Sequence, residues 1–321
     1  MSESQYTTKN NNSHHWFVIV NPAAASGKAK RIWRAIKQEL EQVKISFAYE
    51  FTTHKSHAIE LVKLAIKNGE RNFIAVGGDG TLHEVVNGVF GQKNIDTTEI
   101  TIANIPIGTG NDWIKTHRVK RNYKKAIAVI IRGDTQLHDV GNLMYTTESE
   151  EINKFFINVA GFGFDAAVVK KSDKLGEKGL KGKQGYIIGM LMVMMGYKEQ
   201  VIRFETAENS FEENVFNLNI GICRFNGGGM MVTPHALFDD GKLAMTLVRK
   251  ISRLKIVANF LTLFSGKFIA LEEVMTMKSN FVTLRSQSDM EFEVDGEMIG
   301  ASKSIQISIL PQSIRVISNI D

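Results

Sequence analysis

The sequence has a single cysteine and lacks any apolar run long enough to cross a bilayer. Cys223 excludes an internal disulfide, and we expect it to be a small buried side chain in a reducing cytoplasm. The most apolar run, residues 187–195, has about half of the ~20 apolar residues that a spanning helix requires. Residues 1–15 lack the apolar core of a secretory signal and predict a disordered tail.

Several kinds of site are also missing from the sequence. The eight histidines show no metal-ligand spacing, which argues against zinc chemistry, and no serine-hydrolase elbow is present. The net charge of +5 favours anionic partners such as nucleotides or acidic lipid headgroups but does not identify one. We expect no nucleic-acid partner.

The pattern of apolar residues changes part-way along the chain. With 321 residues, the chain exceeds the ~250–300 at which single cores stop growing, so two domains are expected. Up to about residue 133, short apolar runs at 16–20, 46–51, 73–76 and 100–105 alternate with helical periodicity, which is typical of a parallel sheet with crossover helices. Further on, apolar residues recur at every second position, as in 216–222 and 305–309, and predict antiparallel strands. Helices are expected near 185–197 and 252–264.

Glycine-rich loops follow two of the predicted strands. Gly77-Gly78-Asp79-Gly80-Thr81 lies between a strand and a helix, an arrangement that lets backbone amides and the helix dipole hold a phosphate. A second loop contains Gly108, Thr109, Gly110, Asn111 and Asp112. Loops at the carboxyl ends of strands in one open sheet can face a shared crevice. The stretch around Lys28 is not a Walker motif, because Ala29 replaces the required Ser or Thr.

Five segments in order resemble the diacylglycerol kinase catalytic-domain family, which includes bacterial lipid kinases and is related to sphingosine and ceramide kinases. They are GGDGTLHEVVNG at 77–88, IPIGTGND at 105–112, NVAGFGFD at 158–165, NGGGMMVTPHALFDDG at 226–241 and VDGE at 294–297. The resemblance implies an α/β nucleotide-binding domain like those of phosphofructokinases and NAD kinases (16–137), then a C-terminal all-β sandwich that binds the lipid (138–312). It also implies a terminal strand (313–321) that returns to the first domain.

The resemblance also implies a set of site residues and cofactors. ATP and Mg²⁺ are the expected cofactors. The residues implied to line the nucleotide site are Asn21, Pro22, Ser26, Gly27, Thr53, Gly77, Gly78, Asp79, Gly80, Thr81, Leu82, His83, Gly108, Thr109, Gly110 and Asn111. His83 stands where many members have Asn.

Acidic residues near the end of the chain are the implied catalytic groups. Asp295 is expected to be the general base and Glu297 a supporting or alternative base, although Asp-Gly is also a common hairpin turn. Asp79 and Asp112 are candidates for a catalytic or magnesium-linked role. A structural Mg²⁺ is implied at the Asp240 carboxylate and the main-chain carbonyls of Leu237 and Lys242.

These features predict a kinase that transfers the γ-phosphate of ATP to a hydroxyl of a membrane lipid, diacylglycerol or sphingoid-like. A cytoplasmic enzyme with transient contact to the inner face of the membrane is expected, and a homodimer is left open. Two alternatives remain: an NAD kinase-like phosphotransferase, and a non-catalytic nucleotide-binding regulator. The methionines of the run 190–195 would either fill a core or line an acyl-chain pocket.

Overall fold

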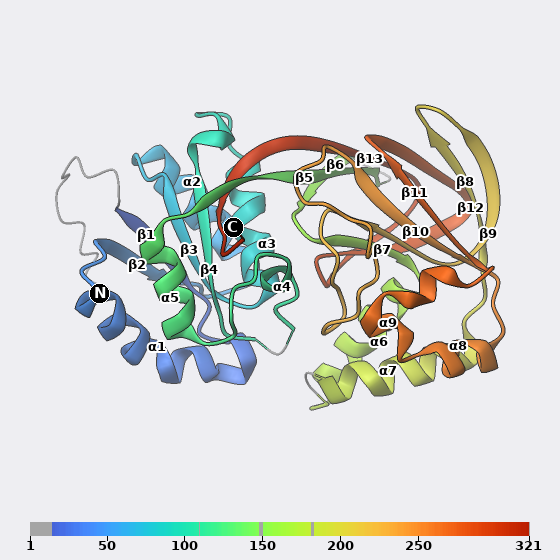
Figure 1. Cartoon of the computed structure of the whole chain (residues 1–321), viewed down its shortest axis with the longest axis horizontal. Coiled ribbons are helices and arrows are strands. Elements are labelled where there is room, and N and C mark those ends of the chain that lie inside the picture. The colour runs from blue at the N-terminus through green and yellow to red at the C-terminus, as the bar shows by residue number, and fades with distance from the viewer. Residues whose placement is uncertain (1–14, 109, 148–149, 181–182, 321) are drawn as a thin grey trace. The chain divides into compact units, whose positions relative to one another are not determined.

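The computed structural model describes residues 15–108, 110–147, 150–180 and 183–320 (Figure 1). Nearly all of the predicted N-terminal tail, and Thr109 of the nucleotide set, lie outside these residues. The chain divides into two compact units. The first contains residues up to Ile107, Val119–Gln136 and Ile314–Asp321, and the second contains Gly108–Arg118 and Leu137–Ser313.

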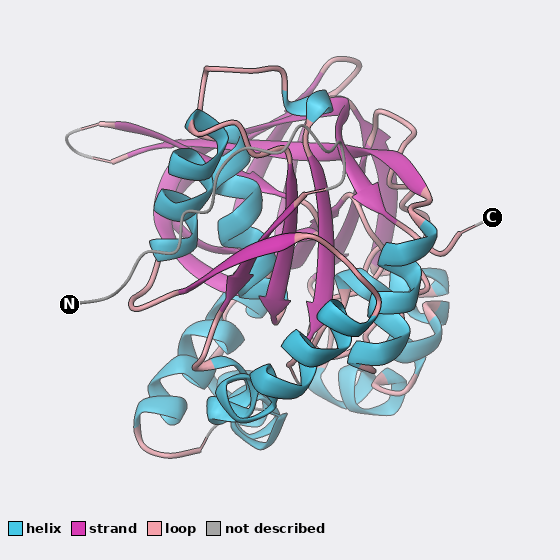
Figure 2. Ribbon diagram, turned by 90° about the vertical axis from the view of Figure 1, so that its left-hand side faces the viewer, coloured by secondary structure: helices cyan, strands magenta, loops and turns pink. Residues whose placement is uncertain are grey.

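The first unit has a parallel sheet with helices on both faces (Figure 2). Its strand order is β2-β1-β3-β4, followed by the end of β13 beside β4. The pairs α1 with α5 and α2 with α3 pack together and cover opposite faces (Figure 1). The bounds are β1 Trp16–Val20, α1 Ala24–Gln42, β2 Phe47–Phe51, α2 His57–Lys67, β3 Asn72–Gly77, α3 Asp79–Phe90, η1 Thr97–Glu99, β4 Thr101–Pro106 and α5 Tyr123–Arg132.

The sequence explains why this sheet forms. Every residue of β1 is buried, as expected for a central strand covered on both faces, whereas the edge strand β2 is largely exposed or half-buried. Ile36 and Leu40 of α1 are fully buried, at the helical spacing seen in the sequence. All four predicted strands are present with bounds within one residue of those expected, and helices lie between them in the chain.

The second unit is mainly antiparallel. Its strands follow the order β11-β10-β9-β7-β12-β13, and β8 pairs with β9 and β12 while β5 pairs with β6 and β13. Alternate residues of these strands, among them Leu218, Ile220, Phe292, Ile305 and Ile307, form one apolar core. The bounds are α4 Trp113–Thr116, β5 Thr135–Thr146, β6 Glu151–Phe156, β7 Val159–Gly163, α6 Phe164–Glu177, α7 Lys183–Gly196, β8 Gln200–Thr206, β9 Ser210–Gly221, β10 Leu243–Arg249, α8 Arg253–Asn259, α9 Thr262–Ser265, η2 Lys267–Ala270, β11 Val274–Ser279, β12 Phe281–Val294 and β13 Glu297–Ile317.

The helices of the second unit differ in part from the prediction. The helices expected near 185–197 and 252–264 are present as α7 and as α8 with α9. The long helix α6 was not predicted; its first two residues, Phe164 and Asp165, end the glycine-rich segment NVAGFGFD. Within the described residues, every helix is too short or too polar to cross a membrane.

Candidate active site

The turn after β3 in the first unit is built for close approach of a ligand. Gly78 is extended and precedes α3, and as a glycine it has no side chain to cap that helix end. A Cβ at Gly77 would lie 2.2 Å from the Thr81 hydroxyl oxygen, so glycine is required there by the fold itself. The first-turn amides and the helix dipole of α3 are suited to a phosphate.

The loop after β1 lies against this turn. The Asn21 side chain donates to the Thr81 hydroxyl at 3.1 Å and accepts from the amide of Ala23 at 3.0 Å. Residues Ala25, Ser26 and Gly27 have left-handed φ angles, so regular helix begins only after Gly27. The structure therefore brings Asn21 and Thr81, both predicted nucleotide residues, into contact.

The remaining predicted nucleotide residues of the first unit lie in the loop before α2 and in the first turns of α3. The Thr53 amide donates to His57 Nδ1 at 3.1 Å at the start of α2. The carboxylate of Glu84, on α3, accepts from the amides of Ser56 and Ala58 and so fixes this loop. Leu82 and His83 are buried, and the His83 ring lies beside the Asn87 amide. Only the main chain of these two residues is suited to contact a nucleotide.

The second glycine loop belongs to the second unit. Asn111 is buried and donates to the Gly108 carbonyl at 2.8 Å. Asp112 accepts from the Gly228 amide at 2.7 Å and pairs with Lys115 at 2.7 Å. The Asp112 carboxylate is thus engaged in holding its own loop to the glycine run at 227–229.

Asp295 lies in a two-residue hairpin turn. Val294 pairs with Glu297 across the turn, and Asp295 and Gly296 both have positive φ, as a type I′ turn requires. The Asp295 side chain is nonetheless tightly held: its carboxylate accepts from the amides of Ile157, Asn158 and Val159 at 2.9–3.2 Å. These three amides fix the orientation of the carboxylate. The adjacent Glu297 is half-buried.

A second acidic pair, which was not among the predicted site residues, lies close to Asp295. Asp165 and Glu293 are buried, and both carboxylates face the space beside Gly161. Asn226 donates to Glu293 at 2.9 Å, and Tyr186 donates to Asp165 at 3.3 Å. Burial raises the pKa of Asp165 to about 6, and burial together with Asp165 raises the pKa of Glu293 well above its usual value.

The one sequence signal for this acidic pair was that Asp165 is the last residue of the family segment NVAGFGFD. The burial that gives both residues their unusual pKa comes from packing of distant segments, which no local motif reports. Perturbed carboxyl groups of this kind are frequent at functional sites.

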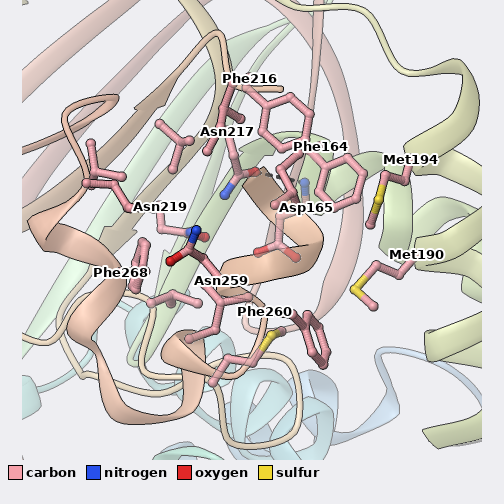
Figure 3. Close-up of a pocket in the computed structure, with 18 of the residues that line it drawn as sticks. Phe164, Asp165, Met190, Met194, Phe216, Asn217, Asn219, Asn259, Phe260 and Phe268 are labelled. Atoms are coloured by element: carbon pink, nitrogen blue, oxygen red, sulfur yellow. Dashed lines mark hydrogen bonds between the residues drawn. The ribbon is translucent and has the colours of Figure 1, made fainter. Parts of the chain in front are cut away.

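An apolar cavity opens beside the acidic pair (Figure 3). Phe164, Phe216, Met190, Met194 and Phe260 are among its lining residues, and the Asp165 carboxylate reaches it. Of the methionines in the 190–195 run, Met190 and Met194 line the cavity whereas Met192 and Met195 are exposed. The run is therefore not simply core filling.

Comparison with known families identifies the chain. The model of the diacylglycerol kinase catalytic domain matches residues 15–143. The model of the YegS C-terminal NAD kinase beta sandwich-like domain matches residues 158–318. The chain belongs to the diacylglycerol kinase catalytic-domain family. The predicted fold class, a nucleotide-binding α/β domain followed by a β-sandwich, is confirmed.

Individual relatives agree with the family models. A diacylglycerol kinase of Staphylococcus epidermidis is 29% identical over 88% of this chain and 85% of its own length. One of Mycobacterium tuberculosis is 26% identical over 93% of each chain. Among solved structures, a diacylglycerol kinase from Bacillus anthracis has a TM-score of 0.69 at 18% identity, covering 95% of this chain and 97% of its own. Yeast NADH kinase has a TM-score of 0.53 at 9% identity, covering 97% of this chain and 85% of its own, and shares the fold alone.

The structural magnesium site implied by the family resemblance fits poorly here. The Asp240 carboxylate accepts from the Lys242 amide at 3.1 Å and pairs with the Lys278 ammonium at 2.5 Å. The charge of Asp240 is thus balanced without a metal, and Mg²⁺ would have to displace Lys278 from the carboxylate. Without the Asp240 carboxylate, the Leu237 and Lys242 carbonyls and water would be the remaining ligands of that site, whereas Mg²⁺ is usually bound through one or two carboxylates.

The raised pKa of Asp165 predicts a pH-dependent stability. Because the folded chain holds this proton more tightly than the unfolded chain, the stabilisation is complete below the unfolded pKa near 3.8 and is lost as pH rises through about 6. Asp165→Asn removes the ionisable group. We expect the variant to unfold at a higher temperature than wild type at neutral pH. The difference between the two unfolding temperatures should become smaller toward pH 4. Thermal unfolding across this range checks it.

The control for this experiment is Asp289→Asn, which changes an exposed acid of the same unit. The difference between its unfolding temperature and that of wild type should stay constant over the same pH range. A wild-type-to-Asp165→Asn difference that does not vary with pH would show that Asp165 is ionised equally in both states.

Proposed function

We propose that this chain transfers the γ-phosphoryl group of ATP, bound with Mg²⁺, to a hydroxyl of a membrane lipid such as diacylglycerol. Membership of the family supports a kinase. The observation that carries the lipid acceptor is the apolar cavity of the second unit, because most of its described lining side chains are apolar and Asp165 is the one carboxyl group among them. A soluble polar acceptor would find few partners in such a cavity.

The first unit supplies the groups for the phosphoryl donor. The turn at Gly77–Gly78 and the first turn of α3 are suited to bind the phosphates through backbone amides. Asp79 lies in that first turn and is our candidate to hold the Mg²⁺ that ATP brings. Mg²⁺ would neutralise charge on the transferred group, the main requirement of phosphoryl transfer.

The second unit supplies the groups for the acceptor. Acyl chains would occupy the space between Phe164, Met194 and Phe260, where apolar surface is removed from water. The flexible methionines allow chains of different shape to fit. Asp295, oriented by three amides, would accept the proton of the lipid hydroxyl, with Glu297 as the alternative base.

An exposed apolar surface supports contact with a bilayer. We call it the outer apolar face; it consists of Ile187, Ile188, Leu191, Met192 and Met195 on α7 and Leu254, Val257, Leu261 and Phe264 on and between α8 and α9. Leu254 is 84% exposed and Leu261 is 78% exposed. Exposing such large apolar side chains to water is unfavourable, and apolar patches of this kind mark protein or membrane contact sites. Arg253 lies beside the α7 part of this face and suits an anionic headgroup. The face adjoins the cavity, because Met194 lines both the cavity and a second pocket formed mainly by residues of the outer apolar face.

A matched pair of variants on α8 separates the cavity from the outer apolar face. Ile256 lines the cavity, whereas its neighbour Val257 is 61% exposed. Ile256→Glu should reduce lipid phosphorylation at least about tenfold both in detergent micelles and on vesicles, because a charge enters the acyl-chain site. Val257→Glu should reduce the rate on anionic vesicles but leave the micellar rate near that of wild type.

Both rates are read from transfer of labelled phosphate to diacylglycerol, with ATP affinity measured separately as the control. Equal effects of the two variants in both assays would argue against a membrane-docking role of the outer apolar face. A normal micellar rate for Ile256→Glu would argue against lipid binding in the cavity.

The NAD kinase-like alternative rests on the shared fold seen in yeast NADH kinase. Purified protein with ATP and Mg²⁺ can be offered NAD and a panel of diacylglycerol, sphingoid, ceramide and phosphatidylglycerol acceptors. Our proposal requires transfer of labelled phosphate from ATP to a lipid and none to NAD. Transfer to NAD alone would favour the NAD kinase-like alternative instead. No transfer to any acceptor would favour a nucleotide-binding regulator.

A further inference from the structure

A cluster of potential metal ligands, none of which is assigned above to catalysis, lies inside the second unit. His117, His138 and Cys223 are fully buried and come from three separate segments. One ligand atom of each, a ring nitrogen or the Sγ atom, lies within 4.8 Å of the other two. The sequence spacing gave no sign of this cluster, because the three residues are brought together only by the fold.

We propose that His117, His138 and Cys223 form a binding site for a structural zinc ion. Imidazole nitrogen and thiolate sulfur are the ligands that Zn²⁺ prefers, and this set excludes Mg²⁺ and Ca²⁺, which take oxygen ligands. Binding displaces the proton of the Cys223 thiol, which leaves to solvent as the Zn–S bond forms. Three protein ligands leave one position of the tetrahedron for water, which is one protein ligand fewer than most structural zinc sites have.

The spacing of the ligand atoms fits this metal. The Cys223 Sγ atom lies 3.5 Å from His138 Nε2. Zn–S and Zn–N bonds of about 2.3 and 2.0 Å at a tetrahedral angle place sulfur and nitrogen about 3.5 Å apart. The His117 ring nitrogen lies within 4.8 Å of the other two ligand atoms and would have to approach them to complete the site. Its ring packs against Trp113 and Phe238, with centroid distances of 4.2 and 4.9 Å.

The surroundings orient the ligands as in known zinc sites. His138 Nδ1 lies within hydrogen-bonding reach of the Asp139 carbonyl, so Nδ1 carries the proton and Nε2 presents its lone pair toward Cys223. Burial lowers the pKa of His138 to about 4 and that of His117 well below its usual value, which keeps both imidazoles neutral. The Asp139 carboxylate, held by the amides of Gly241 and Gln312, offsets part of the added positive charge.

The position of the cluster suggests what a zinc ion would do. Cys223 contacts the Ile157 carbonyl at 3.4 Å, and the Ile157 amide in turn donates to Asp295. Metal binding would join the segments around His117, His138 and Cys223 and fix the amides that orient Asp295. This role is structural, and it holds whatever the acceptor substrate is.

Metal analysis of the full-length protein tests the proposal without relying on activity. Protein from zinc-supplemented cultures, freed of loosely bound metal, should contain about one zinc per chain. After exchange for Co²⁺ it should show a thiolate-to-cobalt charge-transfer band. Zinc below about a tenth of an equivalent, or a cobalt spectrum without that band, would overturn the site.

Variants identify the ligands. Cys223→Ser should abolish the charge-transfer band, and His138→Gln should lower zinc content severalfold. His235→Gln, which changes a half-buried histidine of the same unit outside the cluster, should retain both signals. Zinc content unchanged in both cluster variants would place the metal elsewhere and reject the site. If either variant fails to fold, the wild-type metal content and cobalt spectrum still decide.

Discussion

Asp295→Asn should lower turnover by about 10²–10⁴-fold while the protein still binds ATP. The carboxylate is oriented by the amides of Ile157, Asn158 and Val159 and would take the proton of the acceptor hydroxyl. Asparagine can keep its oxygen at the position that accepts from Asn158 and Val159. Its amide group would then face the Ile157 amide, and neither can accept. The side chain would be retained in place but would no longer act as a base.

Three measurements separate loss of the base from loss of structure. Steady-state kinetics with lipid give turnover, calorimetric titration gives ATP affinity, and thermal unfolding reports the lost hydrogen bond, about 1–3 kcal/mol. Glu297→Gln is the matched control, since it removes the neighbouring carboxylate across the same turn. Turnover of Asp295→Asn within threefold of wild type would reject Asp295 as the base. A far larger loss for Glu297→Gln would transfer the role to Glu297.

Local patterns were sufficient to predict most of the fold. Period-two and helical spacing located the predicted strands, including β1 at Trp16–Val20, because burial on one or both faces dictates those spacings. The helix α6 was not predicted, and its first two residues end a glycine-rich segment. Residues 108–118 follow a strand of the first unit yet belong to the second, through contacts such as that of Asp112 with Gly228. Such contacts between distant segments leave no local signal.

The candidate site was predictable only where the motif itself makes the geometry. The turn at Gly77 follows from a strand, a turn and a helix that are adjacent in sequence. Asn21 and Thr81 are 60 residues apart and meet because β1 and β3 pair in parallel. Glu293 lies two residues before Asp295, but its burial beside Asp165 depends on how β12 pairs with β7. His138 and Cys223 are 85 residues apart and meet only after folding.

Gly80 offers a test of the nucleotide site that separates binding from stability. It lies in the first turn of α3, is exposed, and a Cβ there would have nothing within 4 Å. The fold therefore places no demand for glycine at this position, unlike Gly77. Alanine in a helix is favoured over glycine by about 1 kcal/mol. A glycine that costs stability and relieves no clash indicates that the open space is needed by a ligand.

Gly80→Ala should accordingly be at least as stable as wild type yet bind ATP at least about tenfold more weakly, because the new methyl group stands where a phosphate would approach the amides. Gly176→Ala is the matched control: Gly176 also lies in a helix, α6, with open space around its Cβ position, but in the second unit. It should gain similar stability with no change in ATP affinity. Calorimetric titration and thermal unfolding measure both effects. Unchanged ATP affinity in Gly80→Ala would mean that the first turn of α3 does not hold the phosphates, and the donor site would have to be sought elsewhere.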